Sequence, residues 1–515
     1  MTHLPIWGLQ EPAVSFAPIK ANLEVDVAII GAGITGLTLA HRLKEAGRTV
    51  AVLEMHAVGS GATSHTTGHL TAAMDLGYSV LQASFGQAGA AEAATKSMAA
   101  IDYIAGLVAR YGIDCDFQRV SGWRYTEDPE GGGELEAEYA VARALGLSVE
   151  LVGRGPLPFM HQALRFGDQA IIDPSRYLQA LARMVHGDRC HIFEHSRVDD
   201  VVVGDPCQVR TGSYTVTAVD VVHATHVPIG LVLPLQLRIA PYMSYVIAVR
   251  LGGQLPPDMY WDTAEPYHYI RPARAADGTR VLLIGGEDHK TGQEPDTTAR
   301  FTALEQYARQ RFSVSEIVGR WAGEVFEPVD GFPYIGRLGP HRHVYCATGF
   351  GGTGLTLGTV AAADICGLIL DEARPLSFFA PQRYKPVASA RNFLRQTGNV
   401  AWRIISDRLH GADAYSVGEI PPGEGRLTEV EGKKLAVYRE PGGDLHLLSP
   451  VCPHLGGIVQ WNSALESWDC PLHGSRFSPT GEVLAGPACQ ELCRIQGEAP
   501  ASEASPEPGP QGVGV

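Results

Sequence analysis

A glycine-rich turn near the N-terminus constrains the fold of this chain more than any other feature. Gly31-Ala32-Gly33-Ile34-Thr35-Gly36 follows an apolar run at 25–30 that predicts a buried strand, and it opens a helical pattern over 34–46. In such a turn Gly31 allows the tight bend, Gly33 lets the backbone approach a pyrophosphate, and Gly36 lets the helix pack on the strand. Free N–H groups at the helix start stabilise phosphate charge. The pattern predicts a βαβ unit that binds a dinucleotide; the alternative is a merely tight strand-to-helix turn.

An acidic residue after the next predicted strand supports this interpretation. The strand covers 49–53, and Glu54 follows it, 18 residues after Gly36. A carboxylate in this place accepts hydrogen bonds from ribose hydroxyls and disfavours a 2′-phosphate, but it does not distinguish FAD from NAD. Two later segments favour a flavin: the hydroxyl-rich loop 59–68, and the glycine loop 349–354, which opens a helix to about 370. The N-terminus of that helix suits the flavin N1/C2 region, which gains negative charge on reduction.

The composition predicts a soluble, cytoplasmic protein of about three domains. The chain has 515 residues, 45% of them apolar, and no run that approaches the roughly 18 apolar residues of a membrane span. The N-terminus lacks the basic and apolar regions of a secretory signal. Because the net charge is −15 and no dense basic stripe is present, nucleic acid is not expected as a partner. The nine cysteines form no disulfide framework.

Alternating strand-like and helical stretches predict an α/β block from 25 to about 370, followed by a small all-β module. Helices are expected at 87–110, 133–146 and 174–186, the last with Asp173 as N-cap, and strands at 219–224, 242–250 and 280–284. A linking stretch at 381–410 is expected to be helical near 392–409. From 414 onward, short β-type runs alternate with Gly/Pro turns, and the tail is rich in Pro, Gly, Ser and Glu.

Two Cys/His pairs in the β module predict a metal site. Cys452-Pro453-His454 and Cys470-Pro471-Leu472-His473 are separated by 15 residues, and each loop offers one thiolate and one imidazole. Zinc knuckles usually pair two cysteines within one loop, which differs from this spacing. The pattern suits a Rieske [2Fe–2S] cluster, in which two cysteines hold one iron and two histidines hold the other. We therefore predict Cys452, His454, Cys470 and His473 as cluster ligands.

The surroundings of these loops resemble a Rieske domain over about 416–493, with two departures from its high-potential type. That type has an additional cysteine in each loop, and here Gly457 and Leu472 stand in those places. It also has a Ser and a Tyr that donate hydrogen bonds toward the sulfurs; Ser475 is present, but Phe477 replaces the Tyr. The resemblance implies a potential below the top of the roughly −150 to +300 mV Rieske range. Two further cysteines, 489 and 493, are expected to be structural or incidental.

Several blocks of the larger part resemble the D-amino-acid oxidase, glycine oxidase and sarcosine oxidase superfamily of FAD enzymes. They are 25–54, 61–67, 222–225, 330–336 and 347–358, and their order is more specific than any one of them. The resemblance implies a Rossmann-type FAD domain interleaved with an antiparallel-sheet substrate domain, and oxidation of a C–N bond by hydride transfer to flavin N5. Some relatives attach FAD to a cysteine before the block at 330–336. The stretch 320–324 has no cysteine, which suggests non-covalent FAD.

The expected cofactor contacts combine the motifs with the resemblance. They are Gly31, Gly33, Ile34, Thr35, Gly36, Glu54, Gly61, Ala62, Thr63, Thr66, Thr67, Val198, Ala224, Thr225, Gly349, Gly352, Thr353 and Gly354.

The expected domain organisation has five parts. They are an N-terminal arm at 1–24, an oxidoreductase block at 25–380, a linker at 381–413, a Rieske domain at 414–497 and a disordered tail at 498–515. Within the block, FAD-binding parts are expected at about 25–75, 165–235 and 320–380, and substrate-domain parts at about 76–164 and 236–319.

The resemblance also suggests substrate-side residues on two predicted strands. Relatives bind a substrate carboxylate there with tyrosines and a basic residue, and Arg271 suits a bidentate grip. His289 falls where relatives place flavin-facing polar groups. Tyr245 and Tyr269 are further catalytic candidates, and Tyr242 is also considered; the alternative for each is a solvated polar cluster. Two histidines of the first loop, at 65 and 69, are expected to be loop hydrogen-bonders.

The two modules together predict a flavin dehydrogenase. It would oxidise a small amine or amino-acid-like substrate and relay electrons singly through the cluster to a soluble acceptor. In a rival reading, the flavin works as an oxidase with O₂ and the Rieske domain senses redox state or docks a partner. In a second rival reading, the protein is an electron-transfer reductase that receives electrons from a reduced partner. The sequence has no second nucleotide motif for NAD, which disfavours that reading. The substrate, the acceptor and the oligomeric state stay open.

Overall fold

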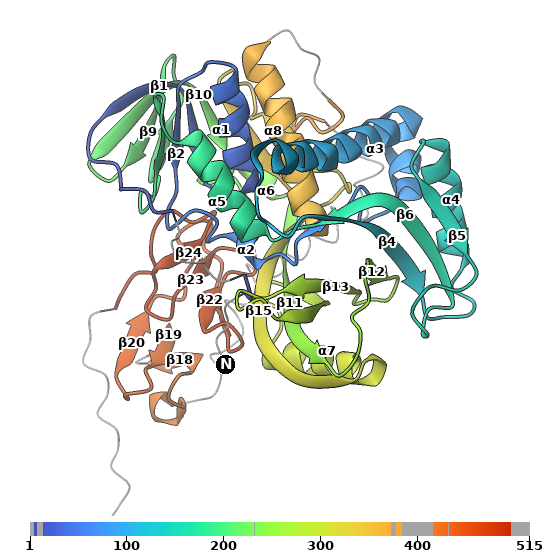
Figure 1. Ribbon diagram of the computed structural model, residues 1–515. Coiled ribbons are helices and arrows are strands. Elements are labelled where there is room, and N and C mark those ends of the chain that lie inside the picture. The colour runs from blue at the N-terminus through green and yellow to red at the C-terminus, as the bar shows by residue number, and fades with distance from the viewer. Residues whose placement is uncertain are drawn as a thin grey trace, which may run out of the picture.

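The computed structural model describes residues 5–7, 14–230, 232–371, 377–383, 416–430 and 432–495. Two large sheets are interleaved along the chain, and a small β module follows them, drawn in orange and red in Figure 1. The expected mixed α/β block with a C-terminal all-β module is therefore confirmed. The expected linker helix near 392–409 and the tail at 498–515 lie outside the described residues.

The first sheet has a parallel centre that follows the expected dinucleotide-binding pattern. Its order is β16-β17-β10-β1-β2-β7, with the β8-β9 hairpin attached to β10. Its strands are β1 (Leu23–Ile30), β2 (Val50–Leu53), β7 (Cys190–Phe193), β8 (Asp200–Val202), β9 (Cys207–Thr211), β10 (Tyr214–His223), β16 (Tyr334–Arg337) and β17 (Val344–Thr348). The centre is buried on both faces, as parallel strands require, so β1 and β2 are nearly continuous apolar runs.

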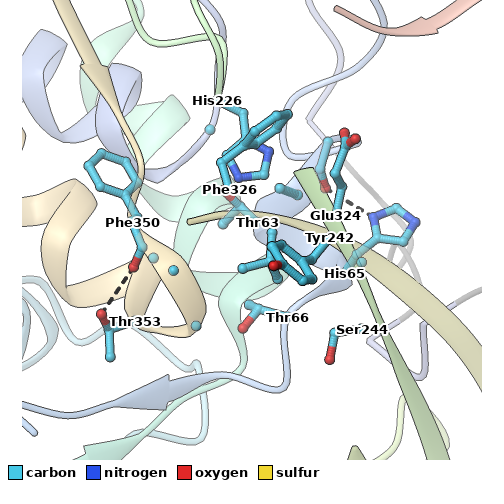
Figure 2. A pocket seen from close by; sticks show the side chains of 18 of the residues that line it. Thr63, His65, Thr66, His226, Tyr242, Ser244, Glu324, Phe326, Phe350 and Thr353 are labelled. Carbon is cyan, nitrogen blue, oxygen red and sulfur yellow. Dashed lines mark hydrogen bonds between the residues drawn. The ribbon is translucent and has the colours of Figure 1, made fainter. Parts of the chain in front are cut away.

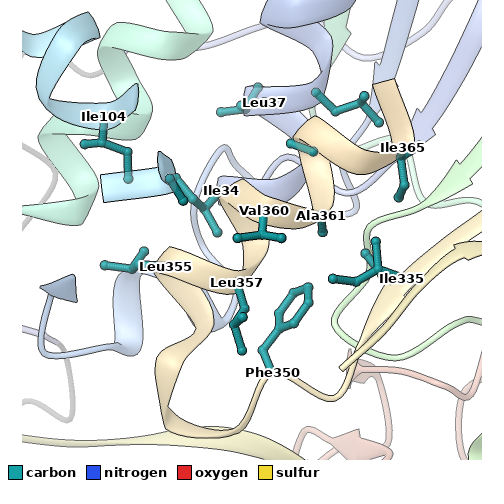
Figure 3. Packing of buried hydrophobic residues seen from close by; sticks show 14 of the residues in the cluster. Ile34, Leu37, Ile104, Ile335, Phe350, Leu355, Leu357, Val360, Ala361 and Ile365 are labelled. Carbon is teal, nitrogen blue, oxygen red and sulfur yellow. The ribbon is translucent and has the colours of Figure 1, made fainter. Parts of the chain in front are cut away.

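Helices α1 (Ile34–Glu45), α5 (Pro174–Val185) and α8 (Gly354–Leu370) pack with this sheet. Figure 3 shows Ile34 and Leu37 of α1 beside Val360 and Ala361 of α8. Asp173 caps α5 as expected, because its carboxylate accepts hydrogen bonds from the backbone N–H groups of the first turn. The segment Gly351–Leu370 is long and apolar enough to cross a membrane by composition. However, 78% of its most apolar 18-residue stretch is buried inside the protein, as in the core helix of a globular domain.

The second sheet is mostly antiparallel and has the order β15-β11-β14-β13-β12-β4-β6-β3, with β5 paired to β6. Its strands are β3 (His69–Leu70), β4 (Gln118–Thr126), β5 (Val149–Val152), β6 (Gln162–Ile171), β11 (Ile239–Leu251), β12 (Met259–Asp262), β13 (His268–Arg274), β14 (Arg280–Lys290) and β15 (Val314–Pro328). The remaining helices are α2 (Ala62–His65), α3 (Tyr78–Tyr111), α4 (Gly133–Ala144), α6 (Leu233–Gln236) and α7 (Thr298–Arg311). The helix expected at 87–110 thus begins earlier, and a non-helical Gly86 interrupts α3.

Two expected domain boundaries differ from the sheet topology. The FAD-binding parts expected to begin near 165 and 320 begin inside β6 and β15, which both belong to the second sheet. The chain therefore returns to the first sheet only after Ile171 and Pro328. Boundaries within a strand could not be seen from composition, because both sheets use similar apolar runs.

The small module consists of a three-stranded and a four-stranded antiparallel sheet. Its strands are β18 (Gly425–Val430), β19 (Lys433–Arg439), β20 (Leu445–Leu448), β21 (Gln460–Asn462), β22 (Ser467–Asp469), β23 (Arg476–Phe477) and β24 (Val483–Ala485). It has a core of its own, which includes Trp468, Phe477 and both cluster cysteines. Met55, just beyond β2, packs against that core, so the two modules are in contact.

Candidate functional site

One cavity of about 1040 Å³ lies where the two large sheets and the small module meet. Its volume is slightly above the roughly 300–1,000 Å³ of typical small-molecule sites. The glycine turn, the 59–67 loop and the 351–354 loop line it, and Figure 2 shows Thr63, Thr66 and Tyr242 around the same pocket. Of the predicted cofactor contacts, sixteen line this cavity: Gly31, Gly33, Ile34, Thr35, Glu54, Gly61, Ala62, Thr63, Thr66, Thr67, Val198, Ala224, Thr225, Gly352, Thr353 and Gly354.

The glycine turn has the close backbone packing that a dinucleotide cradle needs. Gly31 has φ +103°, and a Cβ there would lie 2.6 Å from the Ala224 carbonyl oxygen. A Cβ on Gly36 would overlap the Gly31 carbonyl oxygen, so this glycine lets α1 pack on β1 and does not itself line the cavity. Gly349 lines a smaller adjoining chamber instead. Because Gly31 and Gly33 carry no side chains, the backbone at the N-terminus of α1 is open to the cavity, which fits a bound pyrophosphate.

Glu54 sits at the end of β2 as expected. Its Oε2 accepts a hydrogen bond from the Ala32 N–H at 2.8 Å, and its Oε1 accepts one from the His56 N–H at 3.0 Å. These two bonds hold the carboxylate at the cavity wall, where its remaining lone pairs can accept from ribose hydroxyls. The residues present fit FAD.

Two tryptophans fix the 59–68 loop from outside. Trp321 Nε1 donates to the His65 carbonyl at 2.9 Å, and Trp7 Nε1 donates to the Thr66 carbonyl at 3.1 Å. From inside, Thr63 Oγ1 accepts a hydrogen bond from the Ile34 N–H at the start of α1. The loop is thereby tied to the second sheet and to the glycine turn. His65 and His69 make hydrogen bonds within the loop, to Gly61 O and Thr67 Oγ1.

Arg271 does not line the cavity, which corrects its assignment as a substrate grip. Its side chain is fully buried, and it donates hydrogen bonds to the carbonyls of Gly68 at 2.9 Å, Ile172 at 3.0 Å and Pro272 at 2.8 Å. The Trp7 ring lies 5.5 Å from the guanidinium. Burial lowers the pKa of Arg271 to about 10. The residue is a positioning group for the 66–68 turn.

We expect Arg271→Ala to destabilise the protein rather than to raise KM. The change would remove the hydrogen bonds that Arg271 donates to three buried carbonyls, although Gly68 O would keep the Ile172 N–H; a buried carbonyl left without a partner costs about 1–3 kcal/mol. The melting temperature should fall by several degrees, and FAD should dissociate more readily because the loop beside it is released. Thermal unfolding and FAD content of the purified variant test this. Arg271→Lys should recover part of the loss. If Arg271→Ala has normal stability and FAD content but binds substrate more weakly, Arg271 binds the substrate carboxylate after all.

The other catalytic candidates divide into two groups. Tyr269 lines the cavity, and its hydroxyl lies 2.9 Å from Ser244 Oγ. Tyr245 and His289 lie away from the cavity lining and pair with each other, with 2.9 Å between the Tyr245 hydroxyl and His289 Nε2. His289 Nδ1 is bonded to the Lys290 carbonyl, and burial lowers the pKa of this histidine. Tyr245 and His289 therefore do not face a ligand in this cavity.

Several polar residues of the cavity were missed by sequence reasoning. Asp75, Tyr267, Asp288 and Glu327 line it. Burial raises the pKa of Asp75 to about 6, and it raises the pKa values of Asp288 and Glu327 to about 7 with help from the neighbouring carboxylates. Perturbed carboxylates in a cavity are typical of functional sites. Asp288 directly precedes His289, which the sequence had indicated, but no local pattern distinguishes Asp75 or Glu327.

The four predicted cluster ligands come together on two loops with matching backbone hydrogen bonds. Cys452 N–H donates to Gly457 O and Cys470 N–H donates to Ser475 O, both at 2.8 Å. Both cysteines and His473 are buried, and the rings of His454 and His473 lie 5.1 Å apart. The two thiols interact directly, which lowers the pKa of Cys452 and raises the pKa of Cys470, so the two sulfurs lie close together.

The donor set fits a two-iron cluster better than a single ion. His454 Nε2 and both ring nitrogens of His473 are buried without hydrogen-bond partners. In the described part of the chain, no three His, Cys, Asp or Glu side chains converge on one ion position. A Rieske cluster requires only a thiolate pair at one iron and an imidazole pair at the other. A Cβ on Gly457 would lie 2.7 Å from Leu472 Cγ, so the two positions that hold cysteines in the high-potential type are neighbours in this structure.

The small module closes one side of the cavity, so the two modules form one site together. Six of its residues line the cavity: Arg476, Leu484, Ala485, Gly486, Ala488 and Cys489. Gly474, next to His473, lies against Pro241, Glu324 and Phe326, of which Glu324 and Phe326 also line the cavity. Gly292 on the substrate side similarly abuts Asp469 and Pro471. The second ligand loop therefore lies one layer of side chains from the cavity.

A dinucleotide cradle at a polar cavity, closed by a module with a two-loop Cys/His site, defines a flavoprotein oxidoreductase with an iron–sulfur domain. Residues 26–368 match the FAD dependent oxidoreductase (DAO) family, and residues 412–496 match the Rieske [2Fe-2S] domain. The chain belongs to the FAD dependent oxidoreductase family and carries a C-terminal Rieske domain. FAD and a Rieske [2Fe–2S] cluster are its cofactors, as expected from the sequence.

Individual relatives agree with this assignment. The chain is 31% identical over 497 residues to the Rieske 2Fe-2S iron-sulfur protein YhfW of Bacillus subtilis, covering 95% of this chain and 97% of that one. It is 24% identical over 392 residues to the gamma-glutamylputrescine oxidoreductase of Escherichia coli, covering 73% and 91%. The glycine oxidase structure from Geobacillus kaustophilus superposes with a TM-score of 0.59 at 21% identity, over 70% of this chain and 100% of that one. The last similarity shows the fold alone.

Proposed function

We propose that the protein is a dehydrogenase that oxidises the C–N bond of a small amine and passes the electrons singly through its Rieske cluster to a soluble acceptor. The main support for this proposal is the set of residues that form the cavity wall. Residues of the Rieske module line the same cavity as the FAD glycine turn, and the His473 loop packs on Glu324 and Phe326. Electron tunnelling falls steeply with distance, so a cluster in this position is suited to act as the flavin's electron outlet.

The proposed reaction balances as a two-electron oxidation. When bound, FAD supplies a hydride acceptor and the cluster supplies a one-electron carrier. The C–H bond next to nitrogen breaks and its electron pair leaves as hydride, while the nitrogen lone pair forms a C=N bond. Water then hydrolyses the imine to a carbonyl compound and an amine or ammonia. The two electrons leave one at a time to the acceptor, and the remaining protons go to solvent.

The chain's own residues supply binding and exclusion of water in this proposal. The cofactor contacts are the sixteen cavity residues named above, with non-covalent attachment because β15 has no cysteine. Tyr269, Ser244 and Asp288 form the polar side of the cavity, and Ser244 orients the Tyr269 hydroxyl. A small-amine substrate is supported by the name of the gamma-glutamylputrescine oxidoreductase relative. A cytoplasmic location is supported by the lack of any disulfide bond among the cysteines, all of which lie in the described residues.

Anaerobic titration with a panel of amines and amino acids tests the proposal. A substrate should bleach the flavin absorbance first, and the rhombic EPR signal of a reduced Rieske centre should then grow as electrons reach the cluster. A one-electron acceptor added afterwards should restore the oxidised spectrum. If the flavin bleaches while the cluster stays oxidised, and oxygen alone restores the flavin rapidly, the protein is instead an oxidase with a sensing or docking module.

A further inference from the structure

The substrate side of the cavity carries carboxylates from four separate segments. Asp75 follows β3, Glu265 lies between β12 and β13, Asp288 lies on β14, and Glu327 lies on β15; all four line the cavity. Asp75 accepts a hydrogen bond from the Gly352 N–H at 2.6 Å, whereas Asp288 Oδ1 is buried with no hydrogen-bond partner. The four carboxylates concentrate negative charge on this side of the cavity. The basic groups that act on them are Arg124 near Asp75 and Lys290 near Glu327, and neither of these lines the smaller chamber described next.

A smaller chamber of about 190 Å³ adjoins this part of the cavity. Asp75, Glu265 and Glu327 line both spaces, and Tyr242 and Phe350 offer aromatic surface to both. Every charged residue among those that line the chamber is acidic. Carboxylates beside aromatic rings are the surroundings that an ammonium group prefers, because charge-assisted hydrogen bonds and cation–π attraction act together.

The arginines of the main cavity are already engaged. Each pairs with a carboxylate, in the pairs Arg124–Glu134, Arg197–Asp199, Arg300–Glu287 and Arg476–Asp469. Arg271 is buried against backbone carbonyls outside the cavity. A substrate carboxylate would thus meet carboxylates on this side of the cavity, and no arginine that lines the cavity is free to bind it.

We propose that the substrate is a diamine, that is, an alkyl amine whose chain ends in a second ammonium group, and not an amino acid. The reacting nitrogen lies in the main cavity beside Tyr269 and Asp288, and the distal ammonium lies in the acidic chamber against Asp75 and Glu327. This inference rests on the proposed amine oxidation and specifies its substrate class.

Binding to pre-reduced holoenzyme tests the inference without turnover. Protein reduced with dithionite under nitrogen cannot accept hydride, so calorimetry reports affinity alone. The probes are 1,4-diaminobutane, butylamine and 4-aminobutanoate, which share a four-carbon chain and differ at the far end. We expect the diamine to bind about tenfold or more tighter than butylamine, since hydrogen bonds between charged groups are stronger than those between neutral groups. The amino acid should bind more weakly than butylamine.

Glu327→Gln should remove most of the diamine's advantage over butylamine, measured as the ratio of the two dissociation constants in the same variant. The control is Glu316→Gln on the same strand, which lies outside the cavity lining and pairs with Arg250; it should keep the full advantage. Equal or tighter binding of 4-aminobutanoate would overturn the inference, as would a diamine advantage that survives in Glu327→Gln.

Experiments on the oxidised enzyme distinguish the proposed amine oxidation from the proposed diamine preference. If amino acids bleach the flavin and diamines do not, amine oxidation stands and the diamine inference fails. If diamines bind preferentially but no amine bleaches the flavin, the proposed function fails and the binding preference stands.

Discussion

Gly36→Ala is expected to abolish FAD binding. The added Cβ would overlap the Gly31 carbonyl oxygen and would lie 3.3 Å from Ile29 Cγ2, so α1 must move away from β1. Overpacking of this kind costs about 1–3 kcal/mol, and here backbone atoms offer no easy relaxation. The N–H groups that face the pyrophosphate would shift with the helix. The flavin-to-protein ratio after purification should fall to about one tenth or less of the unmodified protein's, because the cradle depends on close backbone approach.

Gly106→Ala is the matched control for this experiment. Gly106 lies inside α3, and a Cβ there would meet nothing within 4 Å. Alanine in an exposed helix interior is favoured over glycine by up to about 1 kcal/mol, so this variant should be as stable as the unmodified protein or slightly more so. Normal flavin content in Gly36→Ala would show that the dinucleotide cradle lies elsewhere.

Cys470→Ser is expected to remove the iron–sulfur cluster and to stop turnover with one-electron acceptors. Cys470 is buried beside Cys452, and a serine hydroxyl is a poor replacement for a thiolate at iron. The rhombic EPR signal and the iron content should be lost. Substrate should still bleach the flavin under nitrogen, because hydride transfer requires only the FAD block, but the reduced enzyme should then have no efficient outlet.

Two controls distinguish loss of the cluster from loss of FAD or general damage to the module. FAD content must be determined, since the Rieske module forms part of the cavity wall and its distortion can release FAD. Cys493→Ser, at an exposed cysteine of the same module, is the control and should retain the cluster and the turnover rate. If Cys470→Ser keeps its FAD and turns over as fast as the unmodified protein with every acceptor, the relay proposal is wrong.

The sequence by itself determined the parts of the site that lie on contiguous segments. The turn at Gly31–Gly36, the acid at Glu54 and the paired Cys/His loops each combine a local backbone geometry with the functional groups it presents. The spacing of these residues is therefore enough to predict what each segment binds, without knowledge of the tertiary structure. The N-cap of α5 and the parallel strands around β1 followed from the same local rules.

Only the tertiary structure decided which side chains face the cavity. Tyr269 and Arg271 share one side of β13, as alternate strand residues do, yet only Tyr269 lines the cavity. Trp7 and the turn at Gly68 cover Arg271, and both come from segments distant in sequence. The acidic side of the cavity arose in the same way, because Asp75 is distant in sequence from Glu265, Asp288 and Glu327. The Rieske wall comes from a still later segment, 476–489. Burial and charge neutralisation depend on what packs around a residue, and no local pattern records that.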